Sequence, residues 1–245
     1  SAGVIRMEER EVSRLPASGE RAEKHPLMPE QQAVLSILSK ALHRRGFAPF
    51  VLHGVTGSGK TEVYLQCIEQ CIKQGRQAIV LVPEIALTPQ MVSTFRGRFG
   101  HRVAVLHSGL SAGERYDEWR RIRQAQVQVA VGARSAIFAP FEKIGLIILD
   151  EEHESSYKQE ETPRYHARDI ALRRARTHEA VLILGSATPS LESYATARSG
   201  GFTLLEMKRR VMNRPLPQVK VVDMREEFRI GHRSMFSRLL LQKMT

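Results

Sequence analysis

Short apolar runs alternate with amphipathic stretches along most of the chain. The apolar runs cover residues 50–52, 78–82, 103–106, 127–131, 146–149 and 181–184. Between them, apolar residues recur at helical spacing within 34–42, 63–72, 88–99, 112–122, 166–176 and 190–197. Continuous apolar runs between helices indicate strands that are buried on both faces of a parallel sheet. The pattern predicts a doubly wound α/β fold with a mostly parallel sheet, whose ligands bind at the carboxyl ends of the strands.

A glycine-rich segment follows the first apolar run and opens a helical pattern. Gly54 is followed by four residues and then by Gly59, Lys60 and Thr61, which is the spacing of a phosphate-binding loop. Lys60 can reach the β- and γ-phosphates, and the Thr61 hydroxyl can bind Mg²⁺. The alternative is an ordinary glycine-rich turn. The residues expected to bind the nucleotide here are Gly54, Thr56, Gly57, Ser58, Gly59, Lys60 and Thr61.

Acidic residues follow the apolar run 146–149 directly, at 150–152, with His153 after them. An acid at the end of a buried strand can hold Mg²⁺ opposite the threonine of the phosphate loop. A second carboxylate can orient or deprotonate the attacking water. We therefore predict that Asp150 binds the metal and Glu151 is the base, although acids here could instead cap the next helix.

Two smaller signals lie near these motifs. Ser186 and Thr188 follow the last apolar run and could sense the γ-phosphate through His153, although alone they read as a turn with a helix cap. Gln31 lies upstream of the phosphate loop, and its amide both donates and accepts, as recognition of an adenine edge requires. A solvent-facing glutamine is the alternative at that position.

The composition points to a polyanionic partner. Lys and Arg number 37 against 26 Asp and Glu, so the net charge is +11. No apolar run approaches the ~20 residues of a membrane span, and no secretion signal opens the sequence, so we expect a cytoplasmic protein without membrane contact. Cys67 and Cys71 lie four apart on a predicted helix, where we expect buried thiols rather than a disulfide or a zinc site.

The motifs and their order resemble those of superfamily 2 helicases of the Asp-Glu-x-His type, and among them the first motor lobe of the replication restart helicases. The resemblance covers roughly residues 27–205 and rests on the blocks 54–61, 81–90, 107–111, 131–136, 150–153 and 185–189. It implies a RecA-like, three-layer lobe of an ATP- and Mg²⁺-dependent 3′–5′ DNA helicase. It also implies that Gln31 contacts adenine and that Lys60, Asp150, Glu151 and His153 are catalytic.

The same resemblance implies a single-stranded DNA path and a loop that couples DNA to hydrolysis. The loop is 155–169, where aromatic rings beside cations suit base stacking and phosphate neutralisation; a solvated polar loop is the alternative. The expected DNA-binding or coupling residues are Pro83, Thr88, Ser108, Gly109, Arg134, Ser135, Tyr157, Arg164, Tyr165, Arg168, Ser186 and Thr188. The implied partners are single-stranded and branched DNA, single-stranded DNA-binding protein and other primosome proteins.

The domain organisation follows from breaks in the pattern. Residues 1–26 are expected to be a linker or the tail of a preceding DNA-binding region, 27–205 the ATP-binding lobe, and 206–245 an interlobe linker with the start of a second lobe. In that last part we expect a strand at 219–223 and a helix from 237 to 244. Zinc is expected only in parts of the family protein outside this sequence, and this lobe alone is not expected to unwind DNA.

Two other functions are compatible with a phosphate loop. A P-loop kinase of a small substrate would have a mobile charged lid and would lack the Ser-Ala-Thr segment at 186–188, which this sequence contains. A nucleic-acid or partner-binding module that binds nucleotide without hydrolysing it would show nucleotide binding but no turnover.

Overall fold

The structure, a computed structural model, describes residues 26–211 and 219–244. They fall into two compact units that divide between Val211 and Met212. The strands of the first unit are β1 (Ala48–Gly54), β2 (Gln77–Leu81), β3 (Val103–Leu106), β4 (Val129–Gly132), β5 (Ile144–Asp150), β6 (Lys158–Gln159), β7 (Tyr165–His166), β8 (Val181–Ser186) and β9 (Thr203–Met207). Its α-helices are α1 (Pro29–Arg44), α2 (Lys60–Lys73), α3 (Pro89–Phe99), α4 (Ala112–Arg123), α5 (Ala167–Thr177) and α6 (Leu191–Arg198). Short 3₁₀ turns are η1 (Glu84–Ala86), η2 (Gly100–Arg102), η3 (Arg134–Phe138) and η4 (Ser155–Tyr157).

A seven-stranded sheet forms the middle layer, in the order β3-β4-β2-β5-β8-β1-β9. Every neighbouring pair in this sheet runs parallel. The predicted doubly wound α/β fold is therefore confirmed. Each expected apolar run overlaps a strand of this sheet, which explains why the runs are continuous rather than alternating.

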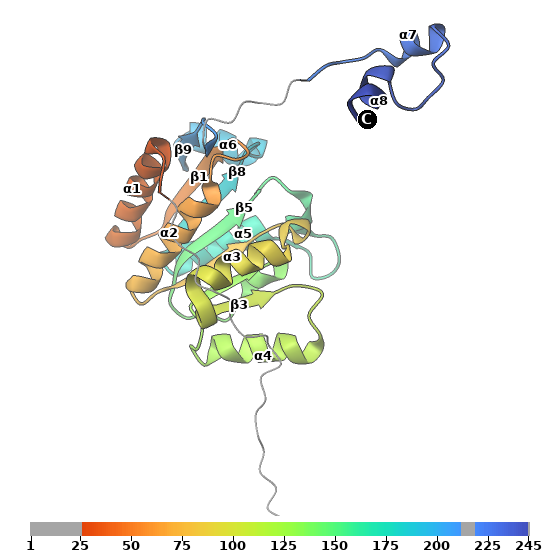
Figure 1. Cartoon of the computed structure of the whole chain (residues 1–245). Helices are drawn as coiled ribbons and strands as arrows, with labels where there is room; N and C mark the ends of the chain where they lie inside the picture. The colour runs from red at the N-terminus through yellow and green to blue at the C-terminus, as the bar shows by residue number, and fades with distance from the viewer. Residues whose placement is uncertain (1–25, 212–218, 245) are drawn as a thin grey trace, which may run out of the picture. The chain divides into compact units, whose positions relative to one another are not determined.

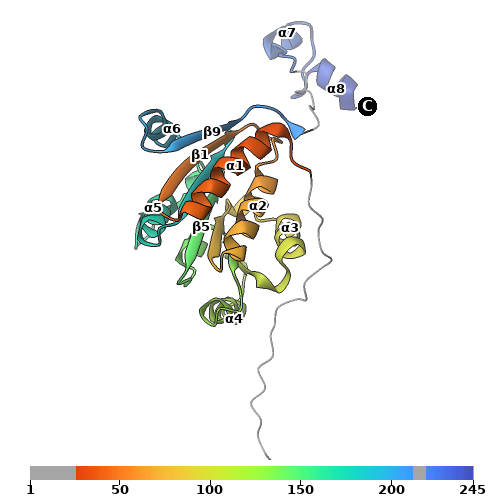
Figure 2. The ribbon, with the colours of Figure 1, turned by 90° about the vertical axis from the view of Figure 1, so that its left-hand side faces the viewer.

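Each face of the sheet carries its own apolar core. Phe50 and Leu52 of β1 pack with residues of α1, α2 and α3, whereas Val51 packs with residues of α4, α5 and α6. Successive strand side chains point to opposite faces, so one run supplies both cores. Figures 1 and 2 show α1, α2 and α3 on one side of the sheet and α5 and α6 on the other. The lobe thus has the three layers that the resemblance implied.

The C-terminal part differs from the sequence-based expectation in two places. Residues 203–207 form β9, which pairs with β1 at the sheet edge, so Met207 belongs to the sheet and not to a linker. No strand forms at 219–223; instead Asp223 caps α7 (Met224–Arg229) by accepting from the Arg225 N–H at 2.9 Å. Val221 is 94% exposed, so within the described residues nothing covers this segment as a sheet would. The expected final helix is α8 (Arg238–Met244).

The prediction that the two cysteines are buried free thiols is confirmed. Cys67 and Cys71 are buried free thiols on α2, and burial raises the pKa of both, that of Cys71 to about 12.

Of the helices that the structure describes, none has the length and apolar character needed to cross a bilayer.

A buried carboxylate closes the edge of the sheet at β3. Glu118 of α4 is fully buried, and its Oε1 accepts the Val105 N–H of this edge strand at 3.2 Å. Its other oxygen accepts from Arg121 Nη1 at 2.6 Å. Burial nevertheless raises the pKa of Glu118. The carboxylate therefore serves as an acceptor for an edge N–H group that would otherwise lack a partner, and unpaired edges invite aggregation.

We predict that Glu118→Ala destabilises the lobe by about 1–3 kcal/mol, because it leaves the Val105 N–H buried without an acceptor. Glu118→Gln keeps one acceptor oxygen and costs less. Urea unfolding of the wild type and both variants measures the difference. Equal stability of the Ala variant and the wild type would contradict this role.

Candidate active site

Three strand ends meet at the carboxyl edge of the sheet. In register, Asp150 of β5 lies beside Gly185 of β8, and Ser186 of β8 lies beside His53 of β1. The phosphate loop follows β1, and the acidic segment 150–153, here called the acidic motif, begins at the end of β5. Motifs that are about 90 residues apart in the sequence are therefore neighbours, as expected for the ligand edge of an open parallel sheet.

The phosphate loop has the backbone of an anion-binding turn at the start of α2. Gly57 and Gly59 both have φ of 80°, and a Cβ on Gly59 would lie 2.1 Å from the Gln31 side-chain nitrogen. Only glycine fits there without strain. The Ser58 hydroxyl is buried and has no hydrogen-bond partner within the described residues. A buried hydroxyl without a partner at the N-terminus of a helix suits a hydrogen bond to a phosphate oxygen.

Lys60 connects the phosphate loop to the acidic motif. Its Nζ donates to the Gly54 carbonyl at 2.9 Å and lies 3.6 Å from Glu151 Oε1. The side chain is only 9% exposed, so its charge is largely removed from water. A buried ammonium in a glycine-rich loop at a helix N-terminus is suited to bind a phosphate chain.

Asp150 is held by a tyrosine hydroxyl from α2. Tyr64 Oη donates to Asp150 Oδ1 at 3.0 Å. Burial, followed by the nearby Glu151 charge, raises the pKa of Asp150 to about 6. Mg²⁺ characteristically takes one or two protein oxygens together with phosphate oxygens and waters. Thr61 and Asp150 suit that need, and within residues 26–211 and 219–244 no cluster of three or more His, Cys, Asp or Glu suggests another kind of metal site.

Glu151 has a left-handed backbone with φ of 46°, which is uncommon outside glycine and clusters at functional sites. This turn directs its carboxylate toward Lys60 and also brings it 3.7 Å from His153 Nδ1. His153 Nδ1 in turn hydrogen-bonds Ser186 Oγ at 2.8 Å, and the Thr188 N–H donates to the same oxygen at 2.9 Å. The structure thus brings His153 together with Ser186 and the Thr188 N–H, and their role in sensing the γ-phosphate stays a prediction.

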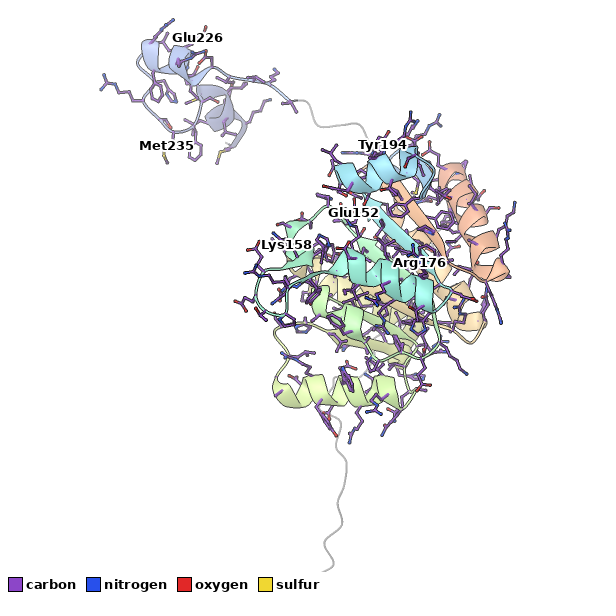
Figure 3. All side chains as sticks on the ribbon, turned by 180° about the vertical axis from the view of Figure 1, so that it is seen from behind. Glu152, Lys158, Arg176, Tyr194, Glu226 and Met235 are labelled. Atoms are coloured by element: carbon purple, nitrogen blue, oxygen red, sulfur yellow. The ribbon has the colours of Figure 1, made fainter. Side chains whose placement is uncertain are left out.

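Glu152 and Tyr64 were not singled out by the sequence. Glu152 is 2% exposed, and its carboxylate accepts from the Ser190 N–H at 2.6 Å and from Ser193 Oγ at 3.0 Å, at the start of α6. Figure 3 shows it near α5 and α6. Tyr64 lies four residues after Lys60 and therefore on the same face of the helix. That spacing is the sequence feature from which its place at the site could have been inferred. Both residues hold the acidic motif in position.

Gln31 contacts the phosphate loop. It is 3% exposed, its Nε2 donates to the Ser58 carbonyl at 3.0 Å, and its Oε1 accepts the Met28 N–H at 2.7 Å. It is therefore not a solvent-facing glutamine. Its contact with adenine stays a prediction.

The expected DNA-path residues separate into two groups. Ser108, Arg134, Ser135 and Tyr165 line a cleft of about 590 Å³ beside β3 and β4. Pro83, Thr88 and Gly109 do not line it; Thr88 caps α3 by accepting from the Met91 N–H at 3.3 Å.

The loop 155–169 carries two corrections. Tyr157 is fully buried, and its hydroxyl donates to the Asp150 carbonyl at 2.6 Å, so it cannot stack on a DNA base. Arg168 turns inward, where its Nη1 donates to Ser190 Oγ at 3.1 Å and lies 3.9 Å from Glu152 Oε2. It is a structural cation rather than a DNA contact. Arg164 is exposed, and its Nε donates to the Glu160 carbonyl at 3.0 Å.

We predict that Gly185→Ala destabilises the lobe by about 1–3 kcal/mol through overpacking. A Cβ there would lie 1.7 Å from Tyr64 Oη. Tyr64→Phe removes that oxygen, so it should recover part of the loss when combined with Gly185→Ala, although alone it costs about 1 kcal/mol for the lost hydrogen bond. A double-mutant cycle by urea unfolding measures the coupling. Strictly additive losses would show that the two positions do not meet.

The fold and the site define a P-loop nucleotide-binding lobe of the RecA-like type. A family model described as DEAD/DEAH box helicase matches residues 28–197, and the chain belongs to that family. ATP and Mg²⁺ use is general in this family.

Two curated relatives are each named replication restart protein PriA. That of Bacillus subtilis (strain 168) is 56% identical over 245 residues, covering 99% of this chain and 30% of its own length. That of Synechocystis sp. is 50% identical, covering 97% of this chain and 29% of its own length. The chain thus spans about 30% of the length of these relatives.

Two solved structures share the fold. RecG bound to a three-way DNA junction aligns with a TM-score of 0.56 at 21% identity, over 84% of this chain and 27% of that one. The Hef helicase domain of Pyrococcus furiosus aligns with a TM-score of 0.53 at 21% identity, over 75% of this chain and 38% of that one.

Proposed function

We propose that this chain is the ATP-binding motor lobe of a cytoplasmic DNA-dependent ATPase, a 3′–5′ DNA helicase that acts in replication restart and primosome assembly. The observation that carries the proposal is the convergence of Lys60, Glu151 and His153 at one sheet edge. The names of the relatives support the biological setting. Because the chain spans about 30% of those relatives, it is expected to bind ATP but not to unwind DNA alone.

In the proposed reaction, the N–H groups of the phosphate loop and Lys60 hold the β- and γ-phosphates of ATP. Thr61 and Asp150 hold Mg²⁺, which when bound neutralises charge on the phosphates. Glu151 orients the attacking water and accepts its proton as the γ-phosphoryl group passes to that water and its bond to the departing ADP breaks. Gln31 binds the adenine edge.

The contact of His153 with Ser186 supports a role in communication. Ser186 also accepts the Thr188 N–H, so a shift of His153 displaces the turn that follows β8. We propose that this turn carries the state of the γ-phosphate site toward the rest of the helicase.

The proposed partners are single-stranded and branched DNA, with single-stranded DNA-binding protein and other primosome proteins. Support for the nucleic acid comes from the net charge of +11 and from the cleft that contains Ser108, Arg134 and Ser135. Pro83, Thr88 and Gly109 are proposed to contact the strand outside this cleft, with Arg164 as a further phosphate contact. Zinc is proposed only for parts of the longer protein that this sequence does not include.

We predict that Lys60→Ala lowers ATP affinity at least tenfold and turnover about a hundredfold or more, because one electrostatic contact to the transition state is typically worth ~3 kcal/mol. Fluorescent-nucleotide binding and phosphate release with and without single-stranded DNA measure the two effects. Lys73→Ala, an exposed lysine at the far end of the same helix, is the matched control and should leave both unchanged. Normal affinity and turnover in Lys60→Ala would refute the assignment.

We also predict that single-stranded DNA binds with strong salt dependence. If about three phosphates are neutralised, the slope of log K against log salt should be near −2, from ~0.7 per contact. Fluorescence anisotropy of a labelled oligonucleotide between low and moderate salt gives the slope. An affinity that does not change with salt, or no binding at low salt, would count against a DNA path on this lobe.

A further inference from the structure

The cleft beside β3 and β4 is lined by Glu84, by residues 106–108 and by three further segments. α4 contributes Arg115 and Trp119, η3 and the residue after it contribute 134–135 and 138–139, and the β6–β7 hairpin contributes Gln159 and Tyr165. Its volume of about 590 Å³ lies within the range of about 300–1,000 Å³ typical of small-ligand sites. Arg115, Trp119 and Phe138 lie outside every helicase motif identified in the sequence. The helicase motifs therefore do not account for these three side chains in the cleft.

Three aromatic side chains, Trp119, Phe138 and Tyr165, line this cleft. Trp119 is 43% exposed and Phe138 is 49% exposed, although both belong to segments that pack on the sheet. Phe138 and Tyr165 meet edge to face with centroids 5.1 Å apart. The neighbouring α4 residues Glu118 and Ile122 are buried, so α4 uses another face for the core and leaves the indole in the cleft. Exposed rings of this kind are suited to stack on a planar ligand.

The two arginines of the cleft, Arg115 and Arg134, donate hydrogen bonds to backbone carbonyls. Arg134 donates to the carbonyls of Ser156 and Lys158, and Arg115 donates to the Leu110 carbonyl at 3.4 Å. These acceptors are neutral, so neither guanidinium is neutralised by them. Arg134 also lies over the Tyr165 ring, 5.9 Å from its centroid.

One acid faces the same space. Glu84 lines the cleft and accepts a hydrogen bond from Ser108. The cleft thus combines two guanidinium groups, one carboxylate already engaged by a hydroxyl, and three aromatic rings. That combination favours an aromatic ligand with attached negative charge over a simple anion, which would need no rings.

We propose that this cleft binds one unstacked base of single-stranded DNA against the Trp119 indole, with the adjoining phosphates on Arg115 and Arg134. The inference rests on the proposed function, because it assumes that DNA crosses this lobe. A base inside a duplex is stacked and paired, so it can enter the cleft only after it has been unstacked, which costs free energy. The cleft therefore selects single strands over duplex by the shape of the ligand, in addition to the charge attraction that both share.

Trp119 is the sole tryptophan of the chain, so its fluorescence reports directly on the cleft. We would titrate the 245-residue chain with a 12-nucleotide oligothymidylate and with an abasic oligomer of the same length, following both Trp119 emission and the anisotropy of a label on the oligomer. The expected result is binding of both oligomers by anisotropy, with quenching of Trp119 by the oligothymidylate only.

Variants separate stacking from a structural role. Trp119→Ala should weaken oligothymidylate binding about tenfold, within the range of one lost stack, and leave the abasic oligomer unchanged. Trp119→Phe keeps a ring and should restore most of the preference for the oligomer with bases. Tyr116→Ala is the matched control, since Tyr116 is a 65% exposed aromatic residue of the same helix that does not line the cleft. It should change neither affinity.

The outcomes distinguish the inference from the function on which it rests. Anisotropy without quenching, or an equal loss of both oligomers in Trp119→Ala, would overturn base stacking and leave DNA binding by the lobe intact. If neither oligomer binds at low salt, both the base-binding cleft and the proposed DNA path on this lobe are overturned.

Discussion

The lack of a side chain at position 185 governs how the catalytic edge is assembled. Gly185 lies between Leu52 of β1 and Asp150 of β5 in register, and a Cβ there would fall 1.7 Å from Tyr64 Oη. Because Tyr64 occupies that space, its hydroxyl reaches Asp150 at 3.0 Å. The same packing fixes the helix that begins at Lys60. The phosphate loop and the acidic motif are therefore aligned by contacts inside the core, and core contacts tolerate little change in volume.

Four consecutive residues then point in four directions from one strand end. Asp150 meets the tyrosine of α2, Glu151 the lysine of the phosphate loop, Glu152 the start of α6, and His153 the serine that ends β8. Regular strand or helix geometry could not distribute them in this way. The positive φ of Glu151 breaks the strand at the required point. The strained backbone is thus part of how one short motif contacts several elements.

Elements with a strong local signal could be predicted from the sequence, and those that depend on distant contacts could not. Buried strands read as continuous apolar runs, and the phosphate loop has a fixed spacing. In the edge strand β9 only Leu205 and Met207 are buried, so it has no continuous apolar run, and it was missed for that reason. Tyr157 was expected at a DNA surface because it is aromatic and lies near cations. In the fold, the Tyr157 hydroxyl donates to the Asp150 carbonyl, and Arg168 lies beside Glu152. Neither partner can be inferred from the sequence of the loop 155–169 itself.

The buried position of Tyr157 changes how a DNA signal could reach the acidic motif. Arg134, in the wall of the cleft, donates to the carbonyls of Ser156 and Lys158, which flank Tyr157 on both sides. Tyr157 then donates to the Asp150 carbonyl at 2.6 Å. Coupling between the cleft and the acidic motif requires an element that has two alternative arrangements. The balance between those arrangements must be shifted by a ligand at either site. Here a phosphate that draws the Arg134 guanidinium away would release two carbonyls on the segment that holds Asp150. Removal of the buried hydroxyl, and not loss of an exposed ring, is therefore the change that would interrupt this connection while leaving the DNA surface intact.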